Sequence, residues 1–548
     1  MHAQLNRDPP CQESVPPIFQ VDGFNSLDLY ELTVDKLQQL LSTGLLTSVD
    51  YVNFCLKRIH MIDCYLEAII ELNPDALSIA ESRDDERQRG VNRGALHGVP
   101  VLVKDNMATD DAMQTTAGSW ALLGSIVPRD AFIVSQLREA GAIILGHANM
   151  SEWASVRSKK YSTGYSPRGG QVRNPYDLSR SPYGSSSGSA AAVSANIVPL
   201  SFGTETDTSI IGPAMKNGVV GIKPTVGLTS RAGVIPISEN MDTVGSFGRT
   251  VADAVHGLNA IVGTDERDPS TLSPSRHQEA DYATFISPKE VLKGAKFGLP
   301  WKRCWELVAA DQKEVAERVF KGMTDAGAEI IRTDFPSAEE RIPSDGVFDW
   351  EHGDPARSEF SVVKIEAYNG INAYLSELSG TSMRKVEDII AYNTENSGTE
   401  GASPGDHPAF PSGQDNLHEL ARSGGRKTET YHRALHHIHA QSRAHGIDAA
   451  LNHTTPHGET VQLDALLLCD DKAAGQELAA QAGYPIICVP IGLDADEMPV
   501  GLSLQHTAWK EGTLIKWASA IEDLVGKTLG GRPRPKYRAY HSKNIPIR

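Results

Sequence analysis

Residues 173–214, RNPYDLSRSPYGSSSGSAAAVSANIVPLSFGTETDTSIIGPA, form the most unusual segment of this 548-residue chain. The segment holds two clusters of small residues, 184–189 and 203–209, joined by an alanine-rich apolar piece. Small residues let a backbone approach a ligand closely, and successive N–H groups ahead of a helix bind anions or oxyanions. Taken alone, however, such a tract is more typical of a flexible loop before an alanine-rich helix.

The same tract formally matches a hydrolase motif. Residues 184–188, GSSSG, fit the G-x-S-x-G nucleophile elbow of α/β-hydrolases. That elbow needs a strand directly before it, whereas residues 173–183 contain two prolines, several charges and no apolar run. The sequence context therefore disfavours an elbow here.

Outward from this segment, short apolar stretches alternate with helical patterns from residue 98 onward. We predict strands at 99–103, 142–145, 219–222, 296–299, 485–490 and 499–505, and helices at 130–140, 187–196, 249–262 and 311–326. Three further helices are predicted upstream, one capped by Thr33, one opened by Thr47 and Ser48, and one running from Asn73 to Gly90. Strand–helix alternation implies an α/β layer fold with a largely parallel or mixed sheet.

The composition excludes several classes of protein. With 40% hydrophobic and 22% charged residues, the chain is neither disordered nor fibrous. The 52 basic and 69 acidic side chains give a net charge of −17, which argues against nucleic acids and anionic membranes as main partners. The six cysteines form no C-x-x-C pair, so a zinc ribbon or thioredoxin motif is excluded. Without a signal peptide or a run of 18 apolar residues, we expect a soluble, cytoplasmic protein with no membrane span.

Several separated motifs resemble those of the amidase signature family. The motifs are GALHGVPVLVKDNMATDDAMQTTAGS at 94–119, the serine–glycine tract, GTETDTSI at 203–210, and the stretches 218–238, 242–254, 482–493 and 498–506. The resemblance extends over residues 30–540 and is weak at 335–445. It implies the α/β amidase signature fold, a mixed β-sheet sandwiched between α-helices.

The resemblance also implies a Ser–cis-Ser–Lys triad. Lys104 falls at the catalytic lysine, Ser185 at the bridging serine that follows a cis peptide bond, and Ser209 at the nucleophile. A serine hydroxyl needs a neighbour to take its proton, and lysine can do so only when burial lowers its pKa from about 10.4. The apolar stretch before Lys104 would desolvate its ammonium group, and Ser185 can relay a proton because a hydroxyl both donates and accepts.

The loop before Ser209 is predicted to stabilise an oxyanion through the backbone N–H groups of residues 206–209. The candidate oxyanion or substrate-binding residues are Thr206, Asp207, Thr208 and Ser186. Asp207 and Thr208 stand where the family commonly has two glycines. Asp207 could repel an oxyanion if it points inward, and β-branched Thr208 tolerates a positive φ poorly.

Further departures lie close to the proposed site. Ile211 stands at the position of a common arginine, and Tyr183 and Ser187 replace glycines that flank the bridging serine. We expect these changes to narrow or weaken activity without abolishing it.

The sequence thus predicts an amidase that hydrolyses a carbon–nitrogen bond, other than a peptide bond, of a small-molecule amide. A seryl acyl-enzyme would yield a carboxylic acid plus ammonia or an amine, with no metal, cofactor or nucleic acid, and a homodimer is left open. One alternative is an A-type subunit of an aminoacyl-tRNA amidotransferase, which frees ammonia from glutamine beside a partner subunit. The missing glycines and arginine around Ser209 disfavour it. Another is a catalytically impaired binding member of the family, supported by Asp207 and Thr208.

The predicted organisation is a single domain. Residues 1–30 form an extension, 31–540 the amidase signature domain and 541–548 a tail. Within the domain, the variable region 335–445 is expected to shape the substrate pocket. Two segments nearer the N-terminus, 114–124 and 150–165, are expected to contribute to that pocket as well.

Two features of the variable region carry weaker predictions. Residues 393–420 are polar and rich in Gly, Pro and Ser, and predict a long surface loop that is either a functional lid or disordered. His432 and His436 lie one helical turn apart, close to His437 and His439. Because no HExxH glutamate accompanies them, a surface or pocket-lining helix is favoured over a metal site.

Overall fold

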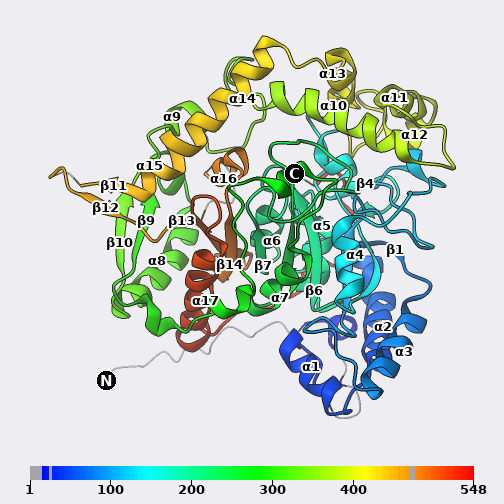
Figure 1. The fold of residues 1–548 in the computed structure, drawn as a ribbon, viewed down its shortest axis with the longest axis horizontal. Coiled ribbons are helices and arrows are strands. Elements are labelled where there is room, and N and C mark those ends of the chain that lie inside the picture. Colours follow the sequence, from blue (N-terminus) through cyan, green and yellow to red (C-terminus); the bar gives the residue numbers. More distant parts are fainter. Residues whose placement is uncertain (1–14, 22, 24–26, 456, 470–474, 548) are drawn as a thin grey trace, which may run out of the picture.

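A mixed sheet of eleven strands forms the centre of the computed structural model, which describes residues 15–21, 23, 27–455, 457–469 and 475–547. The strand order is β1-β3-β2-β6-β8-β7-β14-β15-β13-β9-β10 (Figure 1). The strands are β1 Ile69–Leu72, β2 Pro100–Lys104, β3 Ile143–Ala148, β6 Leu200–Glu205, β7 Val220–Lys223, β8 Thr243–Gly248, β9 Lys296–Pro300, β10 Glu329–Thr333, β13 Ala465–Leu468, β14 Ile486–Leu493 and β15 Pro499–Gln505. Two small hairpins lie outside the sheet, β4 Tyr165–Ser166 with β5 Gly170–Gln171, and β11 Asn452–Thr454 with β12 Thr460–Gln462.

Helices cover both faces of this sheet. They are α1 Val34–Ser42, α2 Ser48–Leu66, α3 Ala76–Gln88, α4 Phe132–Glu139, α5 Ser187–Ser194, α6 Ile211–Lys216, α7 Val251–Ile261, α8 Ala310–Asp325, α9 Ala338–Arg341, α10 Phe360–Glu377, α11 Val386–Glu395, α12 Ser397–Glu400, α13 Asp415–Ser423, α14 Glu429–Ser442, α15 Asp448–Leu451, α16 Glu477–Ala482 and α17 Glu511–Thr528. Strand β14 shows the two-sided burial: Ile486 and Cys488 belong to one apolar core, whereas Ile487 and Val489 belong to the other. Alternate residues of a strand point to opposite faces, so the predicted sandwich of a mixed sheet between helices is confirmed.

Two of the strands that the sequence pattern missed, β6 and β8, contain glycine where two strands approach closely. Gly203 of β6 lies opposite Gly245 of β8, and a Cβ on Gly245 would lie 2.0 Å from the carbonyl oxygen of Ile222. Glycine is therefore required by close backbone approach, yet it weakens the apolar pattern by which a strand is detected. By contrast, each of the six strands predicted from apolar runs has a counterpart in the sheet.

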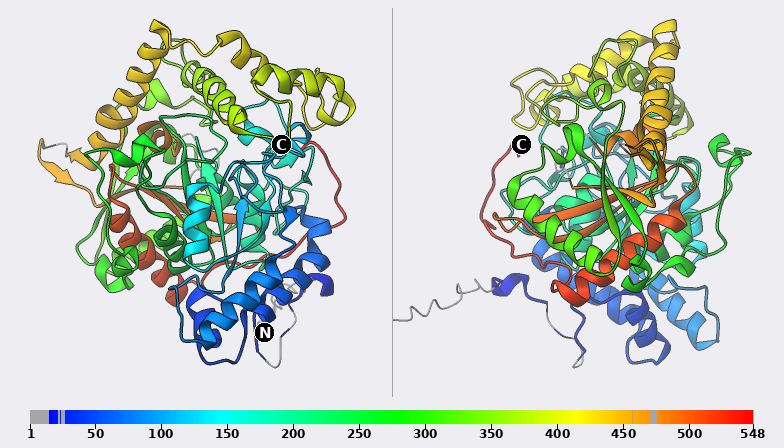
Figure 2. Two further views of the ribbon diagram at one scale, coloured as in Figure 1. Left: turned by 45° about the vertical axis from the view of Figure 1, so that its right-hand side comes forward. Right: turned by 90° about the vertical axis from the view of Figure 1, so that its left-hand side faces the viewer.

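Helices α9–α14 come from the variable region, and α10–α14 lie together along one side of the molecule (Figure 2). The prediction of one long loop over 393–420 is wrong, because this stretch includes the end of α11, all of α12 and most of α13. The buried Arg157 guanidinium donates hydrogen bonds to the carbonyls of Glu400 and Gly401 and lies 3.7 Å from the centre of the Phe410 ring. The polar backbone of this segment is thus satisfied by protein contacts, which its composition alone does not reveal.

Both ends of the described chain pack onto the domain. Phe19 is buried and stacks on Tyr537 at 4.2 Å between ring centres, and Leu29 is buried as well. Near the other end, the Ile547 N–H donates to the Ser162 hydroxyl at 2.7 Å. Residues 1–14, which include Cys11 and about half of the predicted extension, lie outside the described residues. The division into extension, domain and tail stays a prediction.

A buried carboxyl pair gives this packing a testable pH dependence. Burial, together with the neighbouring Glu152, raises the pKa of Glu400 to about 9. The folded chain therefore holds a proton that the unfolded chain releases near its ordinary carboxyl pKa. The stabilisation of the folded chain by this proton is complete below the ordinary carboxyl pKa and is lost as the pH rises through about 9.

Glu400→Gln keeps the shape of the side chain but cannot ionise. We therefore expect thermal unfolding to show a smaller fall in Tm between about pH 7 and about pH 9.5 in Glu400→Gln than in the wild type. Equal falls in Tm in the two proteins would contradict the presence of a proton on Glu400 in the folded chain.

Candidate active site

Lys104 ends β2 with its amino group completely buried. Its Nζ lies 2.7 Å from the hydroxyl oxygen of Ser185, 3.0 Å from that of Ser186 and 2.8 Å from that of Thr204. Strands β2 and β6 are parallel neighbours, with Val103 beside Phe202, so the end of β2 that carries Lys104 lies next to the end of β6 that carries Thr204. The polar groups around the amine are thus uncharged, three hydroxyls and the Thr204 carbonyl at 3.3 Å, with no carboxylate in hydrogen-bond contact among the residues that the structure describes.

The electrostatic setting favours a neutral amine. Burial lowers the pKa of Lys104 to about 7, against the opposing influence of Asp242 and Glu205. An amine that titrates near neutral pH can take a proton from a hydroxyl, whereas an ordinary lysine ammonium cannot.

Ser185 stands immediately after a cis peptide bond, Gly184–Ser185, as the family resemblance implies for this position. Its hydroxyl contacts Lys104, and its carbonyl accepts a hydrogen bond from the Ser151 N–H at 3.1 Å. The next residue joins this segment to the loop that carries Ser209, because the Ser186 N–H donates to the Ser209 carbonyl at 3.3 Å.

Ser209 lies between β6 and α6, where the chain turns from strand to helix. The turn is held by Glu205, whose carboxylate accepts the N–H groups of Ile210 at 2.6 Å and Ile211 at 3.0 Å. A carboxylate at the N-terminus of a helix satisfies donors that have no partner inside the helix. The Ser209 hydroxyl donates to the carbonyl of Asp207 at 3.4 Å.

The backbone N–H groups that are predicted to stabilise an oxyanion differ in their hydrogen bonds. Glu205 also accepts a hydrogen bond from the Thr208 N–H. The N–H groups of Asp207 and Ser209, in contrast, have no acceptor among the residues that the structure describes. The oxyanion role of this loop stays a prediction, and the Asp207 and Ser209 N–H groups are its strongest candidates.

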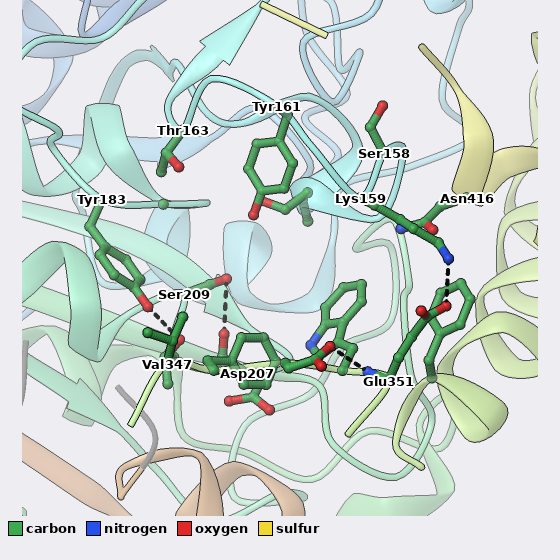
Figure 3. A pocket seen from close by; sticks show the side chains of 18 residues that line it. Ser158, Lys159, Tyr161, Thr163, Tyr183, Asp207, Ser209, Val347, Glu351 and Asn416 are labelled. Carbon is green, nitrogen blue, oxygen red and sulfur yellow. Dashed lines mark hydrogen bonds and ion pairs between the residues drawn. The ribbon is translucent and has the colours of Figure 1, made fainter. Parts of the chain in front are cut away.

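A cavity of about 420 Å³ opens in front of Ser209 (Figure 3). Aromatic side chains form much of its wall: Tyr161, Tyr183, Phe348, Trp350 and Phe360. The predicted segment 150–165 and the variable region both contribute to the lining, whereas 114–124 does not. Across the cavity, the Lys159 amine reaches Glu351 at 2.8 Å (Figure 3).

Asp207 lines the cavity, but Figure 3 shows its carboxyl turned away from the Ser209 hydroxyl. Burial and the negative charge of Glu359 raise the pKa of Asp207 well above its ordinary value. The expected repulsion of an oxyanion therefore does not follow, because the side chain is directed elsewhere and its raised pKa favours the neutral form.

Two other candidates lie outside the cavity wall. Ser186 is buried between Lys104 and the Thr204 carbonyl, to which its hydroxyl donates at 3.0 Å. Thr206 donates instead to the Asp242 carboxylate at 2.6 Å. Neither lines the cavity in the described part of the chain, so a direct substrate contact by their side chains is not supported and both are supporting groups.

Sequence reasoning missed several members of the site. Thr204 contacts the amine of Lys104, and Asn106 donates to the Thr204 hydroxyl at 3.0 Å. Both stand inside motifs that carry the family resemblance, which is the signal that could have found them. No such signal marks Trp350 or Glu359, which come from the variable region.

A family model described as Amidase matches residues 50–515. The chain belongs to the amidase family. A Schizosaccharomyces pombe protein named as a putative amidase is 48% identical and covers 97% of this chain and 91% of its own length. The crystal structure of peptide amidase from Stenotrophomonas maltophilia is 39% identical with a TM-score of 0.81, covering 92% of this chain and 98% of its own. The A-type subunit of glutamyl-tRNA(Gln) amidotransferase from Thermoanaerobacter pseudethanolicus is 30% identical over 90% of this chain and 97% of its own.

The histidine cluster of this amidase lies apart from Ser209. His432, His436 and His437 of α14 line a separate surface depression with Arg357. Within the described ranges, no three His, Cys, Asp or Glu side chains gather as metal ligands would.

Among the helices of the described residues, none has both the length and the apolar character needed to cross a membrane.

Thr208 offers a test of backbone strain beside the nucleophile. Its φ of 53° is left-handed, which costs a β-branched residue about 1–3 kcal/mol and costs glycine nothing. We expect Thr208→Gly to raise the free energy of unfolding by about 1 kcal/mol, measured by urea denaturation. Thr208→Ala loses the same hydroxyl contact with Tyr183 but keeps a Cβ, and should show no gain.

A fall in stability for Thr208→Gly as large as that for the alanine variant would contradict this strain. An unchanged or lower reaction rate in Thr208→Gly would separately show that Thr208 does not constrain the loop for chemistry.

The lowered pKa of Lys104 predicts how the reactivity of Ser209 depends on pH. Since the amine accepts a proton only above its pKa of about 7, labelling of Ser209 by a fluorophosphonate should rise with pH through that value. Lys104→Ala should label about 10²–10⁴-fold more slowly and lose this midpoint. A variant that keeps the wild-type midpoint would exclude Lys104 as the base.

Proposed function

We propose that this chain is an amide hydrolase in which Ser209 is the nucleophile, Ser185 the proton relay and Lys104 the base. The observation that carries the proposal is the fully buried Lys104 amine, 2.7 Å from the Ser185 hydroxyl and titrating near pH 7. The Ser209 residue on the adjoining loop lines a cavity of substrate size.

The first half of the reaction forms an acyl-enzyme. The Ser209 hydroxyl turns from the Asp207 carbonyl toward Ser185 and attacks the substrate carbonyl, while its proton passes through Ser185 to the neutral Lys104. The N–H groups of Asp207 and Ser209 stabilise the oxyanion. The relay then runs in reverse and protonates the departing ammonia or amine.

The second half regenerates the enzyme. Water attacks the acyl-serine and gives its proton to Lys104 through Ser185, and the carboxylic acid leaves as Ser209 recovers its hydrogen. All groups needed for these transfers belong to the chain, and Lys104 ends each half-reaction in its starting state.

We further propose that the substrate is an amide of peptide-like character with an apolar group beside the carbonyl. The aromatic wall formed by Tyr161, Phe348, Trp350 and Phe360 supports an apolar acyl side. The similarity to peptide amidase supports a peptide-like skeleton. This choice is more specific than the small-molecule amide that the sequence alone predicts, and ammonia release keeps the scissile bond outside the peptide backbone.

The alternative of an amidotransferase A-type subunit has support in the 30% identical relative of that name. Such a subunit would act on glutamine beside a partner. Glutamine has a polar carboxamide side chain and also carries a charged α-amino and a charged α-carboxylate group. The aromatic wall would bind such a molecule poorly. Hydrolysis of glutamine in preference to apolar amides would favour this alternative.

Ammonia release from a series of amides tests the proposal. We expect the purified chain alone to hydrolyse N-acetyl-phenylalanine amide with a kcat/KM about 10–100-fold above that for N-acetyl-glycine amide, because burial of a benzyl group contributes about 1.5–3 kcal/mol. Ser209→Ala should abolish hydrolysis and fluorophosphonate labelling.

Ser194→Ala is the matched control for this substitution. Ser194 is a buried serine of α5 whose hydroxyl has no hydrogen-bond partner among the described residues, so its loss should leave the activity intact. Failure of every amide together with failure of the label would favour the impaired binding member instead.

A further inference from the structure

The nucleophile loop is tied to the variable region by two buried carboxyl groups. Asp207 lies two residues before Ser209, and Glu359 directly precedes α10, whose first residue, Phe360, lines the cavity. Asp207 is 5% exposed and Glu359 1% exposed, and their side chains are hydrogen-bonded to each other. The contact joins two segments about 150 positions apart in sequence.

A hydrogen bond between two carboxyl groups requires a proton. Apart from this mutual contact, both carboxyl oxygens of Asp207 and the Oε1 of Glu359 are buried and accept no hydrogen bond from any other donor in the described part of the chain. The remaining oxygen of Glu359 accepts from the Gln481 amide at 2.9 Å. Two carboxylates cannot both ionise at such a contact, so one proton lies between them.

The surroundings of the pair set its charge. Glu205 of β6 and Glu477 of α16 act on Asp207 as negative groups, and burial is the largest influence on both members of the pair. Arg341 of α9 faces Glu359, and Lys223 of β7 faces Asp207. Two acids and two bases thus surround the pair, and burial, the largest influence on both members, favours retention of the proton at neutral pH.

The proton also fixes the backbone that Ser209 uses. The Asp207 carbonyl accepts the Ser209 hydroxyl, and the Asp207 N–H is one of the two candidate donors for an oxyanion. Both groups are oriented by the peptide units on either side of the Asp207 side chain. Anchoring that side chain fixes the loop, and ionisation of the pair would add a negative charge behind the forming oxyanion.

We infer that Glu359 is a positioning residue for the nucleophile loop, acting through a proton that it shares with Asp207. This inference rests on the proposed amide hydrolysis. Glu359 thereby links the region that shapes the substrate cavity to the loop that performs the chemistry. Loss of the shared proton at alkaline pH releases the loop and lowers kcat.

The pH profile of kcat for N-acetyl-phenylalanine amide distinguishes this role from a structural one. The wild type should lose rate on the alkaline side as the pair ionises. In Glu359→Gln the amide donates to Asp207 without any shared proton, so the alkaline loss should disappear while the rate at neutral pH falls less than about threefold. In Glu359→Ala the anchor is absent, and kcat should fall about tenfold or more with a KM within about twofold of the wild type.

Glu400→Gln is the matched control, because it makes the same substitution in the other buried carboxyl pair of the variable region. It should change the pH dependence of Tm but retain the alkaline loss of kcat. An alkaline loss of kcat that persists unchanged in Glu359→Gln overturns the inference, as does a KM rise without a kcat change in Glu359→Ala.

An infrared measurement separates this inference from the proposed function. Difference spectra should contain a protonated-carboxyl stretch in the wild-type protein at neutral pH that is missing in both Glu359→Gln and Asp207→Asn. If that band is present and responds to both variants although no amide is hydrolysed, the pair stands and the proposed function fails. If the band is unaffected by both variants, the pair itself is overturned.

Discussion

Desolvation of the Lys104 amine is the constraint on which this site depends. An ammonium group enclosed by protein is costly unless a carboxylate contacts it, and a contacting carboxylate would hold the proton in place. Here hydroxyl groups surround the amine, and the carboxylates of Asp242 and Glu205 act from beyond hydrogen-bond contact. The amine is thereby satisfied in its neutral form and is able to accept a proton.

The balance between burial and hydrogen bonding also determines the charge of the carboxyl groups around Ser209. Each of these buried carboxyls either accepts several N–H donors or holds a proton. Glu205 follows the first route by accepting donors at the start of α6, and Asp242 does so through the N–H groups of Ile237 and Ser238. Asp207 and Glu359 follow the second. Negative charge is thus kept where backbone donors neutralise it and is withheld from the loop where an oxyanion must form.

The sequence was informative wherever a local pattern determines the structure. Apolar runs predicted β2, whereas Lys104 at its end was named through the family resemblance. Caps such as Thr33 and Thr47 marked helix starts because their side chains bond to the first turn. Ser185 and Ser209 were found through motifs, not through spacing. The position of Glu359 beside Asp207 could not be predicted, because it depends on how α10 packs after the whole sheet has formed. The docked segment 393–420 was missed for a related reason, since its partner Arg157 lies far away in sequence.

The proposed reacting groups and much of the cavity wall come from different parts of the chain and meet at the cavity. The reacting groups come from the strand ends and the serine–glycine tract, where the backbone is fully enclosed. Much of the aromatic wall comes from the variable region, whose sequence carries little family resemblance. Substitutions in this part of the wall can alter the cavity without disturbing the desolvated amine of Lys104, provided that the variable region stays attached to the rest of the domain. The buried pairs Glu152–Glu400 and Asp207–Glu359 each join a residue ahead of the variable region to a residue inside it. Attachment therefore depends on buried carboxyl groups, with the Arg157 guanidinium beside the first pair, and not on apolar packing alone.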